Sequence, residues 1–181
     1  MIRTLALALA VLALAACEEE KEAPPPQELT REAVSYYDQM LVLDHEGPRA
    51  QILLESRDEP IWFSSVRDAF AFHFLPEEPR DIAAIYVTDM ARAPSWEDPG
   101  PGIWIEARDA HFVIGSDRRG GMGAEEPVPF GTTEAAATFA AEHGGEVVDF
   151  DGVPRDYVLG ATAEPAPAPG EGHGDAHGSG H

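Results

Sequence analysis

Short apolar runs separated by turn residues mark the first half of the chain as a series of strands. Residues 50–55 (Ala-Gln-Ile-Leu-Leu-Glu) and 60–63 (Pro-Ile-Trp-Phe) predict two strands joined by a turn at residues 58–59. Ser64 and Ser65 then offer a helix N-cap, with Asp68 placed three residues after Ser65 as in a capping box. Residues 83–87 predict a third, buried strand. The intervening apolar residues have the spacing of one helical face: Val66, Ala69, Phe70, His73 and Phe74.

The second half of the chain repeats this order of elements. Residues 110–115 and 128–130 predict two strands, Thr132 is a candidate N-cap, and residues 146–150 predict a closing strand. Gly144-Gly145 is a strong signal for the end of the helix. The helical face again follows from the spacing of its members: Ala135, Ala136, Phe139, Ala140 and His143.

The repeat predicts the fold class. Each half reads strand, strand, helix, strand, so we expect an α+β protein of two similar ββαβ units with small mixed sheets. We place the first unit at residues 34–94 and the second at residues 95–160, joined by a linker rich in Pro and Gly. The composition of residues 17–33 predicts an acidic, Pro-rich tether, and that of residues 161–181 predicts a disordered, His-rich tail.

The N-terminus has the pattern of a secretory signal. Arg3 precedes an apolar run that is too short to span a bilayer, which takes about 20 residues. The run ends in Leu-Ala-Ala-Cys, which favours a lipoprotein signal peptide at residues 1–16 and a lipidated Cys17 over an ordinary signal followed by a stray Cys. We therefore expect a lipid-anchored protein on the periplasmic side, at the inner or the outer membrane. A lipidated Cys17 also leaves the mature chain without a free thiol.

Charge and motifs narrow the class of function. The formal net charge of −21 argues against nucleic acid as a partner, because phosphate contacts need basic patches. The chain lacks a Cys nucleophile, a Gly-x-Ser-x-Gly elbow, a dinucleotide fingerprint and a His-Glu-x-x-His motif. The sequence therefore predicts a protein that is not an enzyme.

The methionines suggest a metal site. Beyond the initiator there are three, and the thioether is a soft ligand suited to Cu(I). Met122 lies between glycines, where a side chain packs poorly, so we expect its sulfur at the surface. Met40 precedes the first strand of the first unit, and the two sulfurs can meet on one ion if the units face each other. Met90, at the end of a predicted strand, is interpreted as structural.

The histidines divide into three groups. His45 lies five residues after Met40 and is the best nearby nitrogen ligand. His73, His111 and His143 lie on predicted strands or helical faces, and we interpret them as structural. The tail residues His173, His177 and His181 recur every four positions, and they are either a secondary metal site or part of a merely soluble tail.

The order and spacing of several short stretches resemble the NosL family of nitrous oxide reductase accessory lipoproteins, over roughly residues 36–154. The resemblance implies two similar ββαβ units and Cu(I) bound by Met40 and Met122. It also implies delivery of copper to the reductase maturation machinery, which includes the periplasmic protein NosD and its ABC transporter. The matching stretches are Met40, Asp44–Pro48, Gln51, Trp62–Ser64, Ala84–Val87, Asp89-Met90, Val113–Ser116, Gly121–Gly123, Val128–Phe130 and Glu142–Gly145.

One position departs from the family pattern. Asp38-Gln39-Met40 stands where family members commonly have Cys-Gly-Met, so the thiolate is missing. Asp38 can supply a carboxylate oxygen, a poorer ligand for Cu(I). The site is therefore weaker than usual, or His45 completes it, or copper is held fully only when a partner docks.

Three hypotheses follow for the function. In the first, the chain is a Cu(I) metallochaperone that uses Met40, Met122 and Asp38 and serves the maturation of nitrous oxide reductase. In the second, it is a lipid-anchored scaffold of the assembly machinery, and its copper binding is incidental. In the third, it is a general periplasmic metal buffer that works through the His-rich tail at residues 161–181.

Overall fold

The structure is a computed structural model, and it describes residues 23–160. The predicted signal peptide, Cys17, the first part of the tether and the His-rich tail lie outside the described residues. Within residues 23–160, no helix is both long and apolar enough to cross a membrane.

The first sheet has four strands in the order β2-β1-β3-β4. They are β1 (Ala50–Leu54), β2 (Ile61–Phe63), β3 (Ile82–Thr88) and β4 (Trp104–Glu106). The first three agree with the strands predicted from the sequence. β4 was not predicted, and it pairs with β3. Residues 104–106, which the sequence placed in the second unit, thus extend the sheet of the first.

The second sheet repeats the arrangement of the first three strands. β5 (His111–Ile114) lies between β6 (Val128–Phe130) and β7 (Glu146–Val148). In both sheets the first strand of the unit is central, and the strands before and after the helix flank it. The predicted ββαβ repeat and the α+β class are therefore confirmed.

The prediction of mixed sheets is wrong, because every pairing between these seven strands is antiparallel. The reason is the strand order. A helical crossover joins β2 to β3 and makes them parallel to each other, but β1 lies between them and runs opposite to both. Within residues 23–160, the parallel pairing is limited to an isolated bridge between Ser35 and Trp62.

The helices begin where the sequence predicted. In α2 (Val66–Phe74), the Asp68 N–H donates to the Ser65 hydroxyl at 3.1 Å. In α3 (Thr133–His143), Thr132 caps the first turn in the same way, and Gly144 ends the helix with a φ of +74°. The structure adds α4 (Arg155–Leu159) and two 3-10 helices, η2 (Val42–Asp44) and η3 (Ala107–Asp109).

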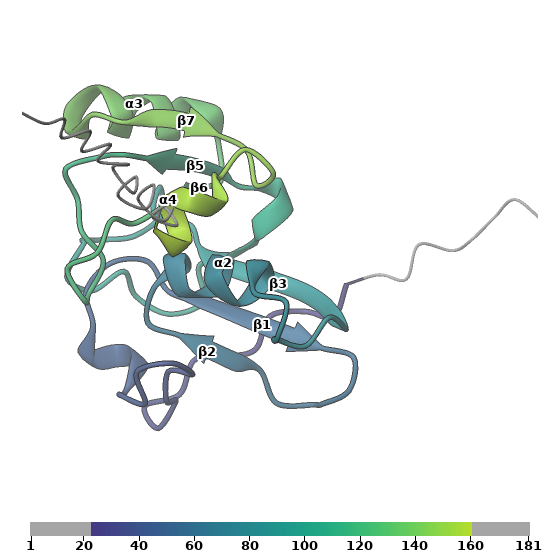
Figure 1. Ribbon diagram of the computed structural model, residues 1–181. Helices are drawn as coiled ribbons and strands as arrows, with labels where there is room; N and C mark the ends of the chain where they lie inside the picture. The colour runs from purple at the N-terminus through teal and green to yellow at the C-terminus, as the bar shows by residue number, and fades with distance from the viewer. Residues whose placement is uncertain (1–22, 161–181) are drawn as a thin grey trace, which may run out of the picture.

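The elements stack in layers, with α2 and α4 between the two sheets and α3 on the outer side of the second sheet (Figure 1). Both units contribute to one core around α2: Phe70 contacts Phe112 and Phe150 of the second unit, with ring centroids 5.1 and 5.0 Å apart. Phe72 lies outside the predicted helical face, yet it is fully buried against Phe63. Because α2 is enclosed on more than one side, apolar residues occupy more than one of its faces.

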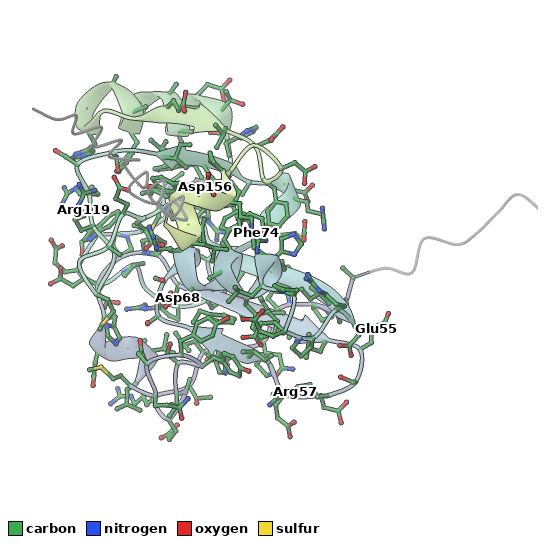
Figure 2. The ribbon with its side chains drawn as sticks, viewed as in Figure 1. Glu55, Arg57, Asp68, Phe74, Arg119 and Asp156 are labelled. Carbon is green, nitrogen blue, oxygen red and sulfur yellow. The ribbon has the colours of Figure 1, made fainter. Side chains whose placement is uncertain are left out.

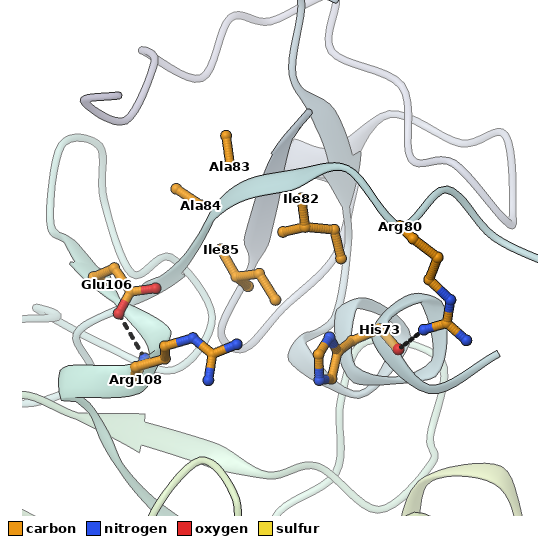
Figure 3. Close-up of a pocket in the computed structure, with 8 residues that line it drawn as sticks. All are labelled: His73, Arg80, Ile82, Ala83, Ala84, Ile85, Glu106 and Arg108. Atoms are coloured by element: carbon orange, nitrogen blue, oxygen red, sulfur yellow. Dashed lines mark hydrogen bonds between the residues drawn. The ribbon is translucent and has the colours of Figure 1, made fainter. Parts of the chain in front are cut away.

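The C-terminal end of α2 is stabilised by arginines. Arg80 donates to the His73 carbonyl at 2.9 Å, and Arg155 donates to the Phe74 carbonyl. Both carbonyls lie in the last turn, where acceptors lack helical partners and cations are favourable. Figure 3 shows the adjoining cavity, in which the Glu106 carboxylate accepts the Arg108 N–H at 2.8 Å. Two arginine side chains thus place positive charge at the C-terminal end of α2.

Candidate metal centre

Asp38 and Met40 lie in a tight turn. Residues Val34 and Leu41 form an antiparallel bridge, and Gln39 reverses the chain with a φ of +59°. Asp38 then folds back, and its Oδ1 accepts the Met40 N–H at 2.8 Å. Asn and Asp side chains commonly accept such a bond from the backbone two residues later.

The second oxygen of Asp38 connects this turn to the first unit. Asp38 Oδ2 accepts the Ser64 hydroxyl at 2.7 Å. Burial acts to raise the pKa of Asp38, but the hydrogen bonds from the Met40 N–H and the Ser64 hydroxyl outweigh it and hold that pKa below its ordinary value. Asp38 is thus a fixed carboxylate at neutral pH.

The loop that carries Met122 is a compact hairpin. The Gly120 N–H donates to the Ala124 carbonyl at 3.0 Å, and the Gly123 N–H donates to the Gly120 carbonyl at 2.7 Å. Gly123 has a φ of +78°, which favours glycine. Met122 lies at the tip and is 61% exposed, as the sequence predicted.

His45 lies between these two segments. Its side chain is buried, and its Nε2 is 3.7 Å from Asp38 Oδ2. On the other side, a Cβ built at Gly121 would lie 2.7 Å from His45 Cβ and 3.0 Å from Nδ1. Only a glycine allows the loop of the second unit to approach the imidazole so closely. The Met40 segment (residues 34–43) and the Met122 loop (residues 120–124) therefore meet at His45, although they are about 80 residues apart in the sequence.

The three methionines differ in their surroundings. Met40 is 46% exposed and Met122 is 61% exposed, whereas Met90 packs against the apolar cluster beneath α3. Large apolar side chains are usually buried, so two exposed thioethers on adjoining segments are unusual. The structure thus separates the two candidate ligands from the methionine interpreted as structural.

A groove of about 270 Å³ opens beside the Met122 loop. Met122 and Asp38 line it, together with Asp68 and Glu126. Figure 2 shows Asp68 at the N-terminal end of α2, on the side of the molecule that also carries Arg119. Burial raises the pKa of Asp68, and it raises the pKa of Glu126 to about 8. The groove therefore combines a thioether, a carboxylate and two carboxyl groups whose pKa burial raises.

Sequence reasoning missed Glu126, Asp68 and Ser64 as parts of this site. Ser64 and Asp68 lie at the start of the predicted helix, where the sequence indicates a capping role. Glu126 lies at the end of a polar turn, two residues before a buried strand, and this position was the available signal. Within residues 23–160, no group of three or more His, Asp or Glu side chains is arranged to hold a metal ion.

The other predicted histidines have structural contacts. His143 Nδ1 is 3.0 Å from an oxygen of Asp117 at the end of α3. His111 Nε2 is 3.1 Å from the Thr133 hydroxyl, and the His73 ring lies beside Phe150. Cys17 and the tail histidines His173, His177 and His181 lie outside the described residues.

Comparisons with known proteins identify the family. The NosL family model matches residues 26–158. The copper-binding lipoprotein NosL of Achromobacter cycloclastes is 46% identical over 160 residues, covering 87% of this chain and 83% of that protein. Its counterpart from Stutzerimonas stutzeri is 31% identical over 167 residues, covering 88% and 84%.

A solved structure supports the same assignment. The crystal structure of the copper chaperone NosL from Shewanella denitrificans matches with a TM-score of 0.68 and 30% sequence identity, covering 73% of this chain and 98% of that chain. The sequence relatives and this fold agree, and the chain belongs to the NosL family.

Proposed function

We propose that this protein binds one Cu(I) ion between Met40 and Met122 and delivers it for the maturation of nitrous oxide reductase. The proposal rests on two segments from different units that each carry an exposed thioether and that adjoin at the Asp38–His45 pair. Thioether sulfur prefers Cu(I) over hard cations such as calcium or magnesium. The relatives named as copper-binding lipoproteins and as a copper chaperone support the choice of metal.

Asp38 and His45 complete the ligand set in this proposal. Asp38 is held as a carboxylate next to Met40, and His45 Nε2 has no hydrogen-bond partner among the described residues. An unpartnered buried nitrogen costs stability unless something binds it. A soft sulfur pair with weaker oxygen or nitrogen donors suits a carrier, because such a site can release its ion to a stronger one.

The surroundings of the site suit docking. The exposed large apolar side chains of residues 23–160 all lie on the Met40 segment or at Met122, and a concentration of this kind marks an interaction surface. We propose that the partner is NosD with its ABC transporter, which passes copper toward the reductase. These side chains are Val34, Tyr36, Tyr37, Met40, Leu41, Leu43 and Met122.

The location in the cell follows from Cys17 in the same proposal. Lipidated at Cys17, the protein is anchored to the membrane on the periplasmic side, as the name lipoprotein of its relatives suggests. The predicted tether at residues 17–33 differs from the structure in its second part, where Gln27 exchanges hydrogen bonds with Gln51 and Pro24 accepts one from Tyr86. In this proposal the residues before Pro24 let the folded domain reach its partner. The protein acts as a carrier and not as an enzyme.

The same exposed apolar surface favours a second candidate function, a scaffold for the assembly machinery. In that case partner binding is independent of copper, and a double variant of Met40 and Met122 still supports reductase maturation. The metal-buffer hypothesis makes a different prediction, since removing residues 161–181 would then abolish most metal binding.

An anaerobic Cu(I) competition titration of the full-length protein tests the carrier proposal. We expect Met40→Ala and Met122→Ala each to weaken Cu(I) binding about tenfold or more, which corresponds to about 1.4 kcal/mol or more. Met90→Ala is the matched control, because it removes a thioether that packs against the core. If all three variants bind Cu(I) like the wild type, the site is misplaced.

A further inference from the structure

Glu126 is the most deeply buried carboxyl group near the candidate metal centre. Its side chain is 1% exposed, and it lies four residues after Met122. Glu126 Oε1 accepts the Val66 N–H at 2.7 Å and the Arg67 N–H at 3.2 Å. These N–H groups belong to the first turn of α2, where donors lack helical acceptors. A side chain of the second unit thus satisfies the helix of the first.

Further bonds fix the backbone around Glu126. The Arg67 guanidinium donates to the Glu125 carbonyl at 3.2 Å, and the Tyr157 hydroxyl donates to the Glu126 carbonyl at 3.2 Å. The end of the Met122 loop is therefore held to α2 on one side and to α4 on the other.

The residues directly before α2 hold the other methionine segment. The Ser64 hydroxyl donates to Asp38, and Asp38 accepts the Met40 N–H. The Ser64 N–H donates to the Ser35 hydroxyl at 3.3 Å, at the base of the same turn. Residues 64–67 thus contact both segments, with Ser64 binding the Met40 side and the N–H groups of the helix binding Glu126.

The second oxygen of Glu126 faces the groove side of the loop. Oε2 has no hydrogen-bond partner among the described residues, although it is buried. A Cβ built at Gly120 would collide with this oxygen, so glycine at that position makes room for the carboxyl group. Glu126 also lines the groove that Met122 and Asp38 share. The loop therefore has a glycine beside each of these side chains, Gly120 beside Glu126 and Gly121 beside His45.

We propose that Glu126 is a positioning residue that sets the place of Met122 relative to Met40, and that it does so without contacting the metal. The proposal rests on the proposed function, since it assumes that both thioethers bind one Cu(I). The hydrogen bonds from α2 to Glu126 Oε1 hold the end of the Met122 loop against the first unit, and they thereby fix where the loop lies. Loss of these bonds frees the loop and lowers the chance that both sulfurs reach the ion together.

The test compares Glu126→Gln with Glu126→Ala in the full-length protein. The amide oxygen of Gln accepts the same two N–H bonds, whereas Ala accepts none. We expect Glu126→Ala to bind Cu(I) at least tenfold more weakly, with X-ray absorption reporting one sulfur neighbour instead of two. We expect Glu126→Gln to restore both the affinity and the sulfur count. Glu125→Ala is the matched control, because its side chain is exposed.

Two results would overturn the inference. One is wild-type affinity and sulfur count in Glu126→Ala. The other is a Glu126→Gln variant as weak as Glu126→Ala, which would mean that the carboxylate charge, and not its placement of the loop, supports the metal. If Glu126→Ala fails to fold, Gly120→Ala replaces it: the added methyl displaces the Glu126 carboxyl group, and we expect the same loss of one sulfur. An unchanged sulfur count in Gly120→Ala would contradict the proposal.

The same titration separates this inference from the proposed function. If Met40→Ala and Met122→Ala weaken Cu(I) binding while Glu126→Ala does not, the inference alone fails. If the methionine variants bind normally, the proposed function itself fails.

Discussion

Glu126 makes the stability of this protein depend on pH in a direction opposite to that of most carboxyl groups. Its pKa is about 8 in the folded chain, against 4.5 for an unperturbed Glu, and the main cause is burial. Between these two pH values, Glu126 is ionised in the unfolded chain and protonated in the folded chain. Stability is therefore complete below about pH 4.5 and is lost as the pH rises through about 8.

The magnitude follows from the difference between 8 and 4.5. At about 1.4 kcal/mol for each pH unit, the loss is on the order of 5 kcal/mol once both states are ionised. This is a large fraction of the roughly 5–15 kcal/mol that stabilises a typical domain. Glu126→Gln removes the titration and keeps an oxygen that accepts the Val66 and Arg67 N–H bonds.

Urea unfolding at a series of pH values, followed by tryptophan fluorescence, measures this effect. We expect the wild type and Glu126→Gln to be similar near pH 4.5, and the variant to gain several kcal/mol over the wild type by pH 8.5. The comparison cancels the contribution of Asp68, whose pKa burial also raises, and that of the net negative charge. If the two stability curves run parallel from pH 4.5 to 8.5, Glu126 is ionised in the folded protein and the reasoning is refuted.

Three further predictions concern stability and location. Ser65→Ala removes the cap of α2 and should cost about 1 kcal/mol in urea unfolding, and Ser65→Asp, which can still cap, should cost clearly less. Phe72→Ala leaves a cavity between α2 and Phe63 of β2 and should cost about 3–5 kcal/mol, and a loss below about 1 kcal/mol would contradict its burial. Cys17→Ser should move the protein from the membrane pellet to the soluble periplasmic fraction, whereas retention in the pellet would argue against a lipid anchor at this residue.

The sequence predicts the repeated units because their signals are local. The short apolar runs of the strands, the caps at Ser65 and Thr132 and the stop at Gly144 each depend on a few neighbouring residues, and the structure has all of them. The direction of strand pairing depends instead on which strand occupies the centre of each sheet. That is a non-local property, and the prediction of mixed sheets was wrong for this reason. β4 was missed for a related reason, since its partner β3 lies outside its own sequence neighbourhood.

The sequence predicted part of the candidate site, as it predicted part of the fold. The glycines around Met122 indicated an exposed side chain, and the structure confirms the exposure. The approach of Gly121 to His45 could not be predicted, because it depends on how the two units pack. Glu126 resembles an ordinary turn residue in the sequence, and only the folded structure shows that it is buried against the start of α2.

The central claim is that a single Cu(I) ion is shared by thioethers from the two units. Methyl signals of methionine labelled with carbon-13 test it directly during anaerobic addition of Cu(I) to the full-length protein. We expect the Met40 and Met122 signals to shift together and to saturate at the same single equivalent, while the Met90 signal stays unchanged. Saturation of Met40 and Met122 at separate equivalents, or a shift of only one of them, would contradict it.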